Sequence, residues 1–233
     1  MQQLPYEILS AIILLLAHEQ TTLASITCVS KKLRQISLAY LYRRPAFHSV
    51  DRFRDFTANL TEEQAQFVSV IDLQLTPHRW SESIGPALCT LAQKAKYIKR
   101  LDIGFCKFAV GQLPSLQYLS TNGCRKINDT VVEHITANCP QLRGLDLSAS
   151  VSTDKALYSI GNHCQHLATL DISQCEQVSE AGLLFLRKKC SRLRSVNVKD
   201  CYNIVGDIDW ESGEEEGWET EGELDEEVQD VIF

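Results

Sequence analysis

Cys139-Pro-Gln-Leu-Arg-Gly-Leu145-Asp-Leu147 is the stretch that decides the fold, because the chain repeats its pattern twice. The pattern returns as Cys164-Gln-His-Leu-Ala-Thr-Leu170-Asp-Ile172 and again as Cys190-Ser-Arg-Leu-Arg-Ser-Val196-Asn-Val198. The cysteines are 25 and 26 residues apart, and each lies three residues before a leucine. A fixed period of this length predicts a solenoid in which every coil contributes one strand and one helix.

The same strand pattern occurs earlier in the chain, in less regular copies. We expect further strands at Val68–Leu73, Ile98–Ile103 and Leu116–Leu119. Only 18 residues separate the matching leucines of the last two, so this coil has no room for a full helix, and residues 110–114 must close it with a tight turn. The period is typical of leucine-rich repeats, an α/β fold with parallel strands on the concave face and helices on the convex face.

Helix start signals fall at the same place in successive coils. Asn128, Thr153 and Ser179 can each cap a helix by accepting a hydrogen bond from a free backbone amide. The acidic residue that follows each of them suits the positive end of the helix dipole. We therefore expect helices to begin at these three positions.

Residues 48–67 are interpreted as a degenerate first repeat. Ser49 is the predicted cap of its helix, and Ser81 is the predicted cap of the next one. The segment lacks the glycine, serine and proline content of a flexible linker, so we expect a rigid connection. Its apolar helix face is predicted to consist of Val50, Phe53, Phe56 and Leu60.

Nine cysteines are distributed along the chain, and most of them follow the repeat. Equivalent residues of successive coils stack in a solenoid, so we interpret these cysteines as ladders of small buried side chains. In one coil Ala149-Ser150 replaces the strand-end cysteine found at Cys124, Cys175 and Cys201, which predicts a missing rung. Free thiols fit a reducing compartment, so we expect an intracellular location in the cytoplasm, the nucleus or both.

Residues 4–44 have the apolar spacing of three short helices. Leu4-Pro-Tyr-Glu-Ile-Leu9 opens the first, with a proline and an acidic residue suited to a first turn. A second apolar helix is expected over Leu23–Leu33, including Val29, and a third over Ile36–Tyr42. Three helices in so few residues are near the lower limit for independent folding, so we expect support from a partner or from the repeats.

This N-terminal segment resembles an F-box. The resemblance covers residues 3–47 and rests on an ordered set, Leu4-Pro-x-Glu-Ile-Leu9, Leu23, Val29-Ser-Lys-x-Leu-Arg34 and Leu41-Tyr-Arg43. The chain departs from the usual pattern at Leu33, where many F-boxes carry tryptophan, and at Thr22, where aspartate is common. The repeats resemble the cysteine-containing leucine-rich repeats that often accompany F-boxes. A plain helical cap shielding the first repeat is the alternative interpretation of this segment.

The resemblance implies a substrate receptor of an SCF-type ubiquitin ligase, which marks proteins for degradation. The F-box would dock on a Skp-type adaptor and through it on a cullin and a RING subunit. The receptor would do no chemistry itself, because holding the substrate near the loaded conjugating enzyme is enough. The alternative is a repeat protein outside any ligase that sequesters or inhibits a partner. The candidates for adaptor docking are Leu4, Pro5, Ile8, Leu9, Leu23, Val29 and Leu33, although some of them must instead hold the three helices together.

Side-chain alternation along each predicted strand decides which residues face the concave surface. With Leu145 and Leu147 pointing inward, Gly144, Asp146 and Ser148 point outward. The same register predicts an exposed polar row that suits a protein substrate offering lysine, arginine or hydroxyl groups. A solvated aspartate near loop amides is the alternative for any one position. The central row is predicted to hold Asp72, Asp102, Ser120, Asp146, Asp171 and Asn197, and the flanking rows Arg100, Tyr118, Asn122, Ser148, Thr169, Ser173, Ser195 and Lys199.

The net charge of −7 conceals a strong split. Residues 207–233 hold 13 acidic and no basic residues, whereas residues 1–206 hold all 23 basic and 17 acidic residues, a net charge of +6. The basic residues are scattered, with no run longer than Arg187-Lys-Lys189, so we expect no nucleic-acid partner. The tail is of low complexity and is predicted to be disordered; a cover folded onto the basic body and a short linear motif are the alternatives.

Neither a catalytic nor a metal-binding constellation is recognised. Cys164 lies between His163 and His166, but the repeat requires it to point inward, so we predict no metal and no cofactor. The apolar run Ala11–Ala17 is far shorter than the roughly 20 residues that span a bilayer, so no membrane partner is expected. We predict a non-catalytic protein with an F-box at residues 1–47, leucine-rich repeats at 48–206 and an acidic tail at 207–233.

Overall fold

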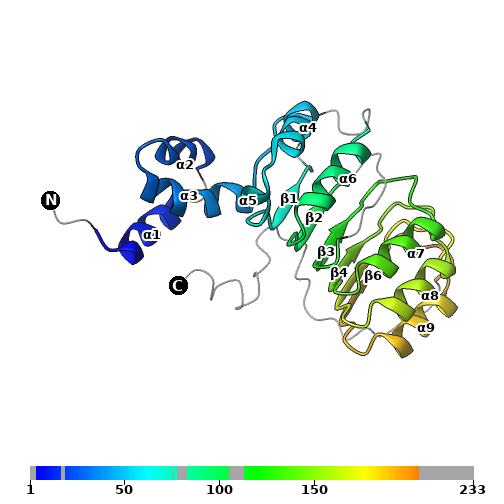
Figure 1. Ribbon diagram of the computed structural model, residues 1–233. Coiled ribbons are helices and arrows are strands. Elements are labelled where there is room, and N and C mark those ends of the chain that lie inside the picture. The colour runs from blue at the N-terminus through cyan, green and yellow to red at the C-terminus, as the bar shows by residue number, and fades with distance from the viewer. Residues whose placement is uncertain (1–3, 17–18, 75, 78–82, 105–112, 205–233) are drawn as a thin grey trace.

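A computed structural model shows a helical bundle joined to a curved solenoid (Figure 1). It describes residues 4–16, 19–74, 76–77, 83–104 and 113–204. Parallel strands form one layer and helices cover one side of it, which confirms the predicted α/β repeat architecture after a helical N-terminus. No helix in these ranges is both long and apolar enough to cross a membrane. The predicted tail and the predicted cap Ser81 lie outside the described residues.

The N-terminal bundle, residues 4–44, contains helices α1 (Tyr6–Leu15), α2 (Gln20–Thr27) and α3 (Lys31–Arg43). Its own small core is formed by the buried side chains of Ile13, Leu23 and Ile36. The Ser30 hydroxyl accepts a hydrogen bond from the Leu33 amide at 3.2 Å and so starts α3. The predicted extent of the second helix is therefore wrong, because Val29 lies in the turn before α3 and Leu33 lies within α3.

Two helices, α4 (Val50–Asn59) and α5 (Glu62–Ala65), connect the bundle to the sheet. Ser49 caps α4 as predicted, by accepting a hydrogen bond from the Arg52 amide at 3.2 Å. Helix α4 packs beside α6 (Gly85–Lys94), the first helix of the convex layer. It therefore takes the place of a repeat helix, although residues 44–49 before it form no strand.

Aromatic side chains close the solenoid core at the bundle end. The ring of Phe47 makes edge contacts with the rings of Phe53 and Phe56, with centroids 5.2 Å apart in both pairs. Tyr42 of α3 stacks on Phe56 with the centroids 6.0 Å apart. The bundle and the first coil of the solenoid therefore share one packed contact.

Six parallel strands of three residues each form the described sheet, in chain order. They are β1 (Val70–Asp72), β2 (Arg100–Asp102), β3 (Tyr118–Ser120), β4 (Gly144–Asp146), β5 (Thr169–Asp171) and β6 (Ser195–Asn197). The register aligns Ile71, Leu101, Leu119, Leu145, Leu170 and Val196 side by side. These aliphatic side chains form the single spine that the repeat predicts.

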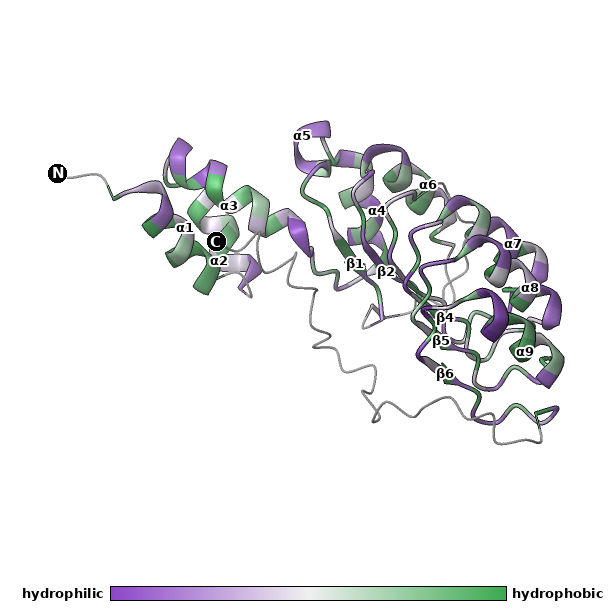
Figure 2. Ribbon diagram, turned by 90° about the horizontal axis from the view of Figure 1, so that it is seen from below, coloured by the Kyte–Doolittle hydropathy of each residue, from purple (hydrophilic) through white to green (hydrophobic). Residues whose placement is uncertain are grey.

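Helices α6, α7 (Asp129–Asn138), α8 (Asp154–His163) and α9 (Glu180–Lys189) cover the convex side of the sheet (Figure 1). Each turns apolar residues toward the strands and polar residues outward (Figure 2). The coil between β2 and β3 includes residues 105–112, which lie outside the described residues together with most of the predicted turn at 110–114.

Successive coils are tied together where their helices begin. The Asp129 carboxylate accepts hydrogen bonds from the amide and the hydroxyl of Thr153, both at 2.8 Å. Asp154 accepts from the amide and the hydroxyl of Ser179, at 2.7 and 2.6 Å. All three helices begin at the predicted positions, and Asn128 and Thr153 accept a hydrogen bond from a helix amide as predicted. The prediction is wrong for the Ser179 side chain, which accepts no such bond and donates to Asp154 instead. The acidic residues do more than face the helix dipole, because they also bridge neighbouring coils.

The repeat cysteines are buried, as predicted. The thiol of Cys175 donates to the Leu147 carbonyl at 3.3 Å. The predicted missing rung is wrong, because Ser150 occupies the cysteine position and is buried there. Its hydroxyl lies 3.4 Å from the Cys175 sulfur and donates to Ser152 at 2.9 Å. A hydroxyl can replace the thiol because these neighbours satisfy its hydrogen bonds.

Candidate protein-binding surfaces

One polar row, the concave row, runs along the sheet with one residue from each strand. The register aligns Asp72, Asp102, Ser120, Asp146, Asp171 and Asn197, in the order that was predicted. The predicted exposure is wrong for most of this row. Asp102, Ser120, Asp146 and Asp171 are between 4% and 7% exposed, and the flanking Ser148 is 4% exposed.

Hydrogen bonds within each coil account for part of this burial. One carboxylate oxygen of Asp146 accepts from the Ser148 amide at 2.9 Å and from the Ser148 hydroxyl at 2.5 Å. Asp171 makes the same pair of bonds with Ser173, at 2.8 and 2.6 Å. An aspartate that binds the amide two residues on stabilises a tight turn. The aspartates therefore serve loop amides, as in the alternative interpretation, but they are buried rather than solvated.

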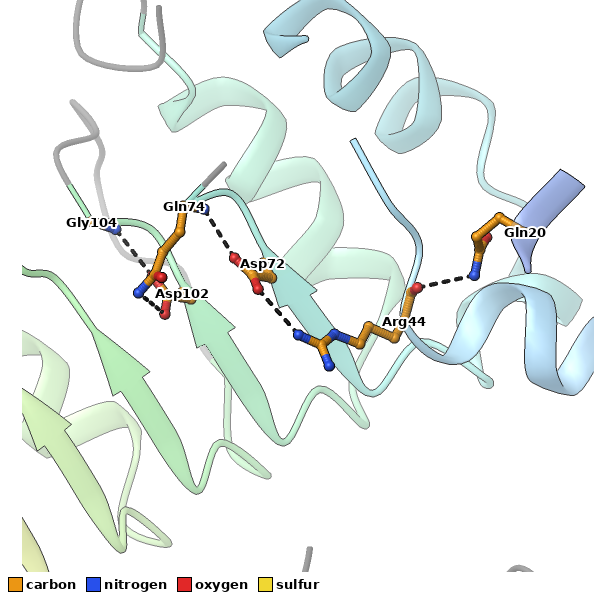
Figure 3. A network of polar contacts seen from close by, with 6 residues as sticks. All are labelled: Gln20, Arg44, Asp72, Gln74, Asp102 and Gly104. Atoms are coloured by element: carbon orange, nitrogen blue, oxygen red, sulfur yellow. Dashed lines mark hydrogen bonds and ion pairs between the residues drawn. The ribbon is translucent and has the colours of Figure 1, made fainter. Parts of the chain in front are cut away.

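The second oxygen of each aspartate points along the concave row. The Ser120 hydroxyl donates to Asp146, and the Asn197 amide donates to Asp171, both at 2.9 Å. At the other end of the row, the side-chain amide of Gln74 donates to Asp102 at 2.6 Å (Figure 3). The concave row is thus a line of acceptors whose positions are set by neighbouring coils.

A polar hollow of about 160 Å³ lies over the concave row beside the bundle. Its lining includes seven of the predicted residues, namely Asp72, Arg100, Asp102, Ser120, Asn122, Asp146 and Asp171. Arg44 and Gln74 also line it, and the sequence interpretation missed both. Gln74 follows Asp72 at the spacing at which Ser148 follows Asp146, so the repeat register could have found it. Arg44 belongs to the bundle and carries no repeat signal.

The remaining predicted residues of the concave face lie outside the lining of this hollow. They are Tyr118, Ser148, Thr169, Ser173, Ser195, Asn197 and Lys199. The Tyr118 ring lies against Gly144 on the next strand, because a Cβ atom there would come within 2.7 Å of the ring. Glycine at this position therefore allows the tyrosine to cover the strand. Asn197 and Lys199 are exposed on the last strand and beyond it.

The hollow carries excess negative charge. Four carboxylates and two guanidinium groups line it, so its formal charge is −2 when all are ionised. Burial, and next repulsion from Asp72, raise the pKa of Asp102 from 3.8 to about 6, against the opposing effects of the Gly104 amide and Arg100. Burial also raises the pKa of Asp146. A cation entering the hollow would relieve the cost of these buried charges.

A chain of hydrogen bonds connects the bundle to the concave row (Figure 3). The side-chain amide of Gln20 in α2 donates to the Arg44 carbonyl at 3.2 Å. The Arg44 guanidinium pairs with Asp72 at 3.3 Å. Asp72 also accepts from the backbone amide of Gln74 at 2.9 Å, and the Gln74 side chain reaches Asp102. The bundle therefore contributes directly to the wall of the hollow.

The outward face of α1, together with Leu4 two residues before it, forms a second candidate surface, the α1 patch. It consists of Leu4, Ile8, Ile12 and Leu15, which are 49%, 47%, 45% and 74% exposed. Their spacing places them on one side of a helix. Of the predicted docking residues, Val29 in the turn between α2 and α3 is also exposed, at 70%. The bundle thus presents large aliphatic side chains to solvent.

The other predicted docking residues differ in their placement. Leu23 is fully buried in the bundle core, so it belongs to the candidates that hold the three helices together. Leu9 and Leu33 pack against the same core and are partly buried, whereas Pro5 is exposed as the N-cap of α1. Ile12 and Leu15 were missed because the motif ends at Leu9, although helical spacing from Leu4 would have found them.

A family model described as the COS11 F-box domain matches residues 1–78. This match covers the bundle and extends through α4, α5 and the first strand. The match runs past residue 47, where we expected the F-box to end. Because it also includes the first strand of the solenoid, it does not locate the domain boundary, which stays a prediction.

Three curated relatives illustrate what the chain is similar to. The Antagonist of mitotic exit network protein 1 of Eremothecium gossypii is 32% identical over 94 residues, 38% of this chain and 24% of that protein. The F-box protein MAX2 homolog A of Petunia hybrida is 31% identical over 99 residues, 40% of this chain and 14% of that protein. The F-box/LRR-repeat protein 4 of Bos taurus is 30% identical over 94 residues, which are 40% of this chain and 15% of that protein. The chain spans a quarter or less of these relatives.

Among solved structures, the chain resembles one in the crystal structure of the Rad7 and Elc1 complex in yeast, with a TM-score of 0.47 and 11% identity. That superposition covers 73% of this chain and 68% of the other.

Proposed function

This chain is an F-box protein with leucine-rich repeats, and from that premise we propose that it is a substrate-recognition subunit of an SCF-type ubiquitin ligase. In this proposal the bundle docks on a Skp-type adaptor, which connects it to a cullin and a RING subunit. The concave face holds a protein substrate. The receptor acts by proximity, because it raises the effective concentration of substrate lysines near the loaded conjugating enzyme.

The observation that carries the proposal is the α1 patch, Leu4, Ile8, Ile12 and Leu15, which the described part of the chain leaves uncovered. Contiguous exposed aliphatic side chains mark interaction surfaces in soluble proteins. Among the bundle residues that the structure describes, three apolar side chains are fully buried in its core, so a partner that covers α1 would also stabilise the bundle. An adaptor docked on this face satisfies both conditions.

Contacts at the junction between the bundle and the solenoid favour a rigid connection between the two. The Ser69 amide donates to the Arg43 carbonyl at 3.0 Å, so the end of α3 is bonded to the chain that enters the sheet. The stacking of Tyr42 on Phe56 and the pairing of Arg44 with Asp72 act at the same place. A rigid junction keeps a bound substrate at a constant distance from the docked adaptor, which a proximity mechanism requires.

The polar hollow on the concave face is suited to bind a lysine or arginine side chain of a substrate. Its acceptors are held in place by neighbouring coils, and its negative charge exceeds its positive charge. A cationic side chain could pair there with Asp102 and Asp146 at little cost in reorganisation. The shared wall with the bundle would place this residue on the side of the solenoid nearest the adaptor.

Adaptor binding tests the proposal. The purified chain is titrated with a purified Skp-type adaptor, and the doubly substituted Ile8→Asp, Ile12→Asp chain is compared with it. Two charges in an apolar interface are expected to weaken binding by at least about tenfold. The matched control is Val151→Asp with Leu184→Asp, which places two charges on solenoid residues that are 49% and 53% exposed.

The control chain should bind like the original, and both variants should keep the circular dichroism spectrum of the folded protein. A third arm, Asp146→Asn with Asp171→Asn, should also leave adaptor binding unchanged, because these residues lie in the solenoid. A folded original chain that fails to bind the adaptor would contradict the proposal and favour a sequestering protein outside any ligase. Equal losses in the α1 variant and the control would contradict the role of the α1 patch.

A further inference from the structure

The last coil of the solenoid is open. In the coil of β4 the inward aliphatic residues Leu142, Leu145 and Leu147 are fully buried. Their equivalents in the last described coil are Leu193, Val196 and Val198, and all three are only half-buried. Repeat proteins bury the face of each coil against the next one, so a terminal coil needs a cover. The described residues supply none at this end.

The backbone of β6 is open as well. In the preceding coil, the Ile172 amide donates to the Asn197 carbonyl at 3.0 Å, and the Gln174 amide donates to the Lys199 carbonyl at 2.8 Å. One coil later the same places are taken by the amides of Val198 and Asp200, and the described residues contain no strand beyond β6 to accept from them. An open strand edge attracts further chain.

The surroundings of this end are strongly basic. Residues 180–204 contain six basic and only two acidic residues. Arg194 and Lys199, on either side of β6, are exposed, and α9 ends in Arg187-Lys-Lys189. The open apolar strip is therefore flanked by positive charge. Whatever covers it must offer apolar side chains together with acidic ones.

The repeat itself ends where this surface begins. Asn128, Thr153 and Ser179 mark the helix starts of three coils, and the corresponding position in the next coil is Val205. Valine has no side-chain oxygen to cap a helix and no hydroxyl to donate to an acidic residue of the previous coil. Residues 205–233 therefore depart from the repeat pattern, and they contain 13 acidic residues and no basic ones.

We propose that residues 205–233 fold back over the open end of the solenoid, with apolar side chains on Val196 and Val198 and carboxylates beside Arg194 and Lys199. The segment is 29 residues long, about one repeat, and follows directly from Ile204, which packs at the rim of the core. Its attachment gives it a high effective concentration at this surface. Its apolar residues include Trp210, Trp218, Leu224, Val228 and Val231.

Charge favours this occupant over a second copy of the chain. Two copies that paired through β6 would bring two basic ends together, and like charges across an interface oppose association. The acidic segment has the opposite sign and sufficient length. The proposal does not depend on adaptor binding, so it can fail while the proposed function stands.

Tryptophan fluorescence of the full chain tests the proposal. Trp80→Phe leaves Trp210 and Trp218, both in the segment, as the only fluorescent indoles. Acrylamide should quench them weakly in this chain and strongly after Arg194→Glu with Lys199→Glu. The matched control is Arg125→Glu with Lys126→Glu, which makes the same change in charge at exposed residues of another coil. The control should be quenched as weakly as its parent at low salt.

Hydrogen exchange on the chain that retains Trp80 provides an independent measurement. The proposal expects protection of the open-edge amides of Val198 and Asp200, with exchange about tenfold faster in the Arg194→Glu, Lys199→Glu chain. Fully quenched tryptophans and unprotected amides at Val198 and Asp200 in the parent would overturn it. Protection that rises with protein concentration would also overturn it, because a second copy would then be the cover. The proposal would also be overturned if the Arg125→Glu, Lys126→Glu control changed quenching and exchange as much as Arg194→Glu, Lys199→Glu.

Discussion

The two ends of the solenoid differ in how their cores are closed. At the bundle end, Val68, Ile71 and Leu73 are at most 1% exposed, under the aromatic contacts of Phe47 and α4. At the far end, Val196 and Val198 remain half-buried. Both ends are built from the same kind of strand, so the difference lies in what packs on them. Each coil contacts only its neighbours, and the stability of a terminal coil therefore depends on its cover.

The concave row differs between the two ends in the same way. Beside the bundle, Arg44 and Gln74 close the hollow over Asp72 and Asp102. At the far end the row finishes in Asn197, an exposed amide. The proposed substrate surface therefore lies at the end that is covered and attached to the bundle. An adaptor on α1 and a substrate in the hollow would therefore both lie at the covered end of the molecule.

Removing an aromatic ring from the covered end should produce the largest loss of stability. Phe53 is fully buried, so Phe53→Ala is expected to lower the free energy of unfolding by about 3–5 kcal/mol. Val198→Ala in the open coil should cost only about 1 kcal/mol, because less apolar area is lost from a half-buried site. Urea unfolding of the full chain measures both. Similar costs for the two substitutions would contradict the comparison.

The bridges between coils should show a smaller contrast. Asp154→Ala leaves the amide and hydroxyl of Ser179 without their acceptor and is expected to cost about 1–3 kcal/mol. The Asp154 carboxylate also lies so close to Gly182 that a side chain there would clash with it. Glu180 is the equivalent acidic residue of the last helix. The next cap position is Val205, which has no hydroxyl to donate to Glu180. Glu180→Ala should therefore change the free energy of unfolding by no more than about 0.5 kcal/mol. Thermal denaturation of both variants would reveal the difference, and equal shifts would count against an interior role of these bridges.

The smallest effect concerns the pH dependence of the concave row. The pKa of Asp102 is about 6 in the folded protein and 3.8 as the reference value, so folding binds a proton between these pH values. The contribution of Asp102 to the free energy of unfolding is therefore greatest below pH 4 and falls as the pH rises to about 6. Asp102→Asn should remove this slope and stabilise the protein at pH 7. Unfolding curves at several pH values for both chains measure it; an unchanged slope would show that Asp102 is not buried as a charge.

The sequence predicted the register of the concave face but not its burial. Alternation along the strands was enough to place Asp102, Asp146 and Asp171 in one row. It could not show that one oxygen of each would bind a turn amide and the other a neighbouring coil, because those partners depend on the path of the turns. Arg44 was out of reach for another reason: it reaches the row across the junction with the bundle.

The bundle shows the opposite outcome. The motif located a helical segment correctly but mixed core and surface positions, since Leu23 holds the three helices together while Ile12 and Leu15 face solvent. A motif reports which residues recur and not which way they point. Only the packing of α1 against α2 and α3 separates the two groups.

By itself, the sequence determined that this protein is a repeat solenoid behind a small helical domain, because aliphatic residues at a constant period can be buried only by stacking coils. It also determined where most helices begin, since capping depends on a few neighbouring residues. The tertiary structure alone decided which acids lie in the hollow, which leucines remain exposed on α1 and which end of the solenoid stays open. These depend on contacts between residues far apart in the chain, and a local pattern carries no information about them.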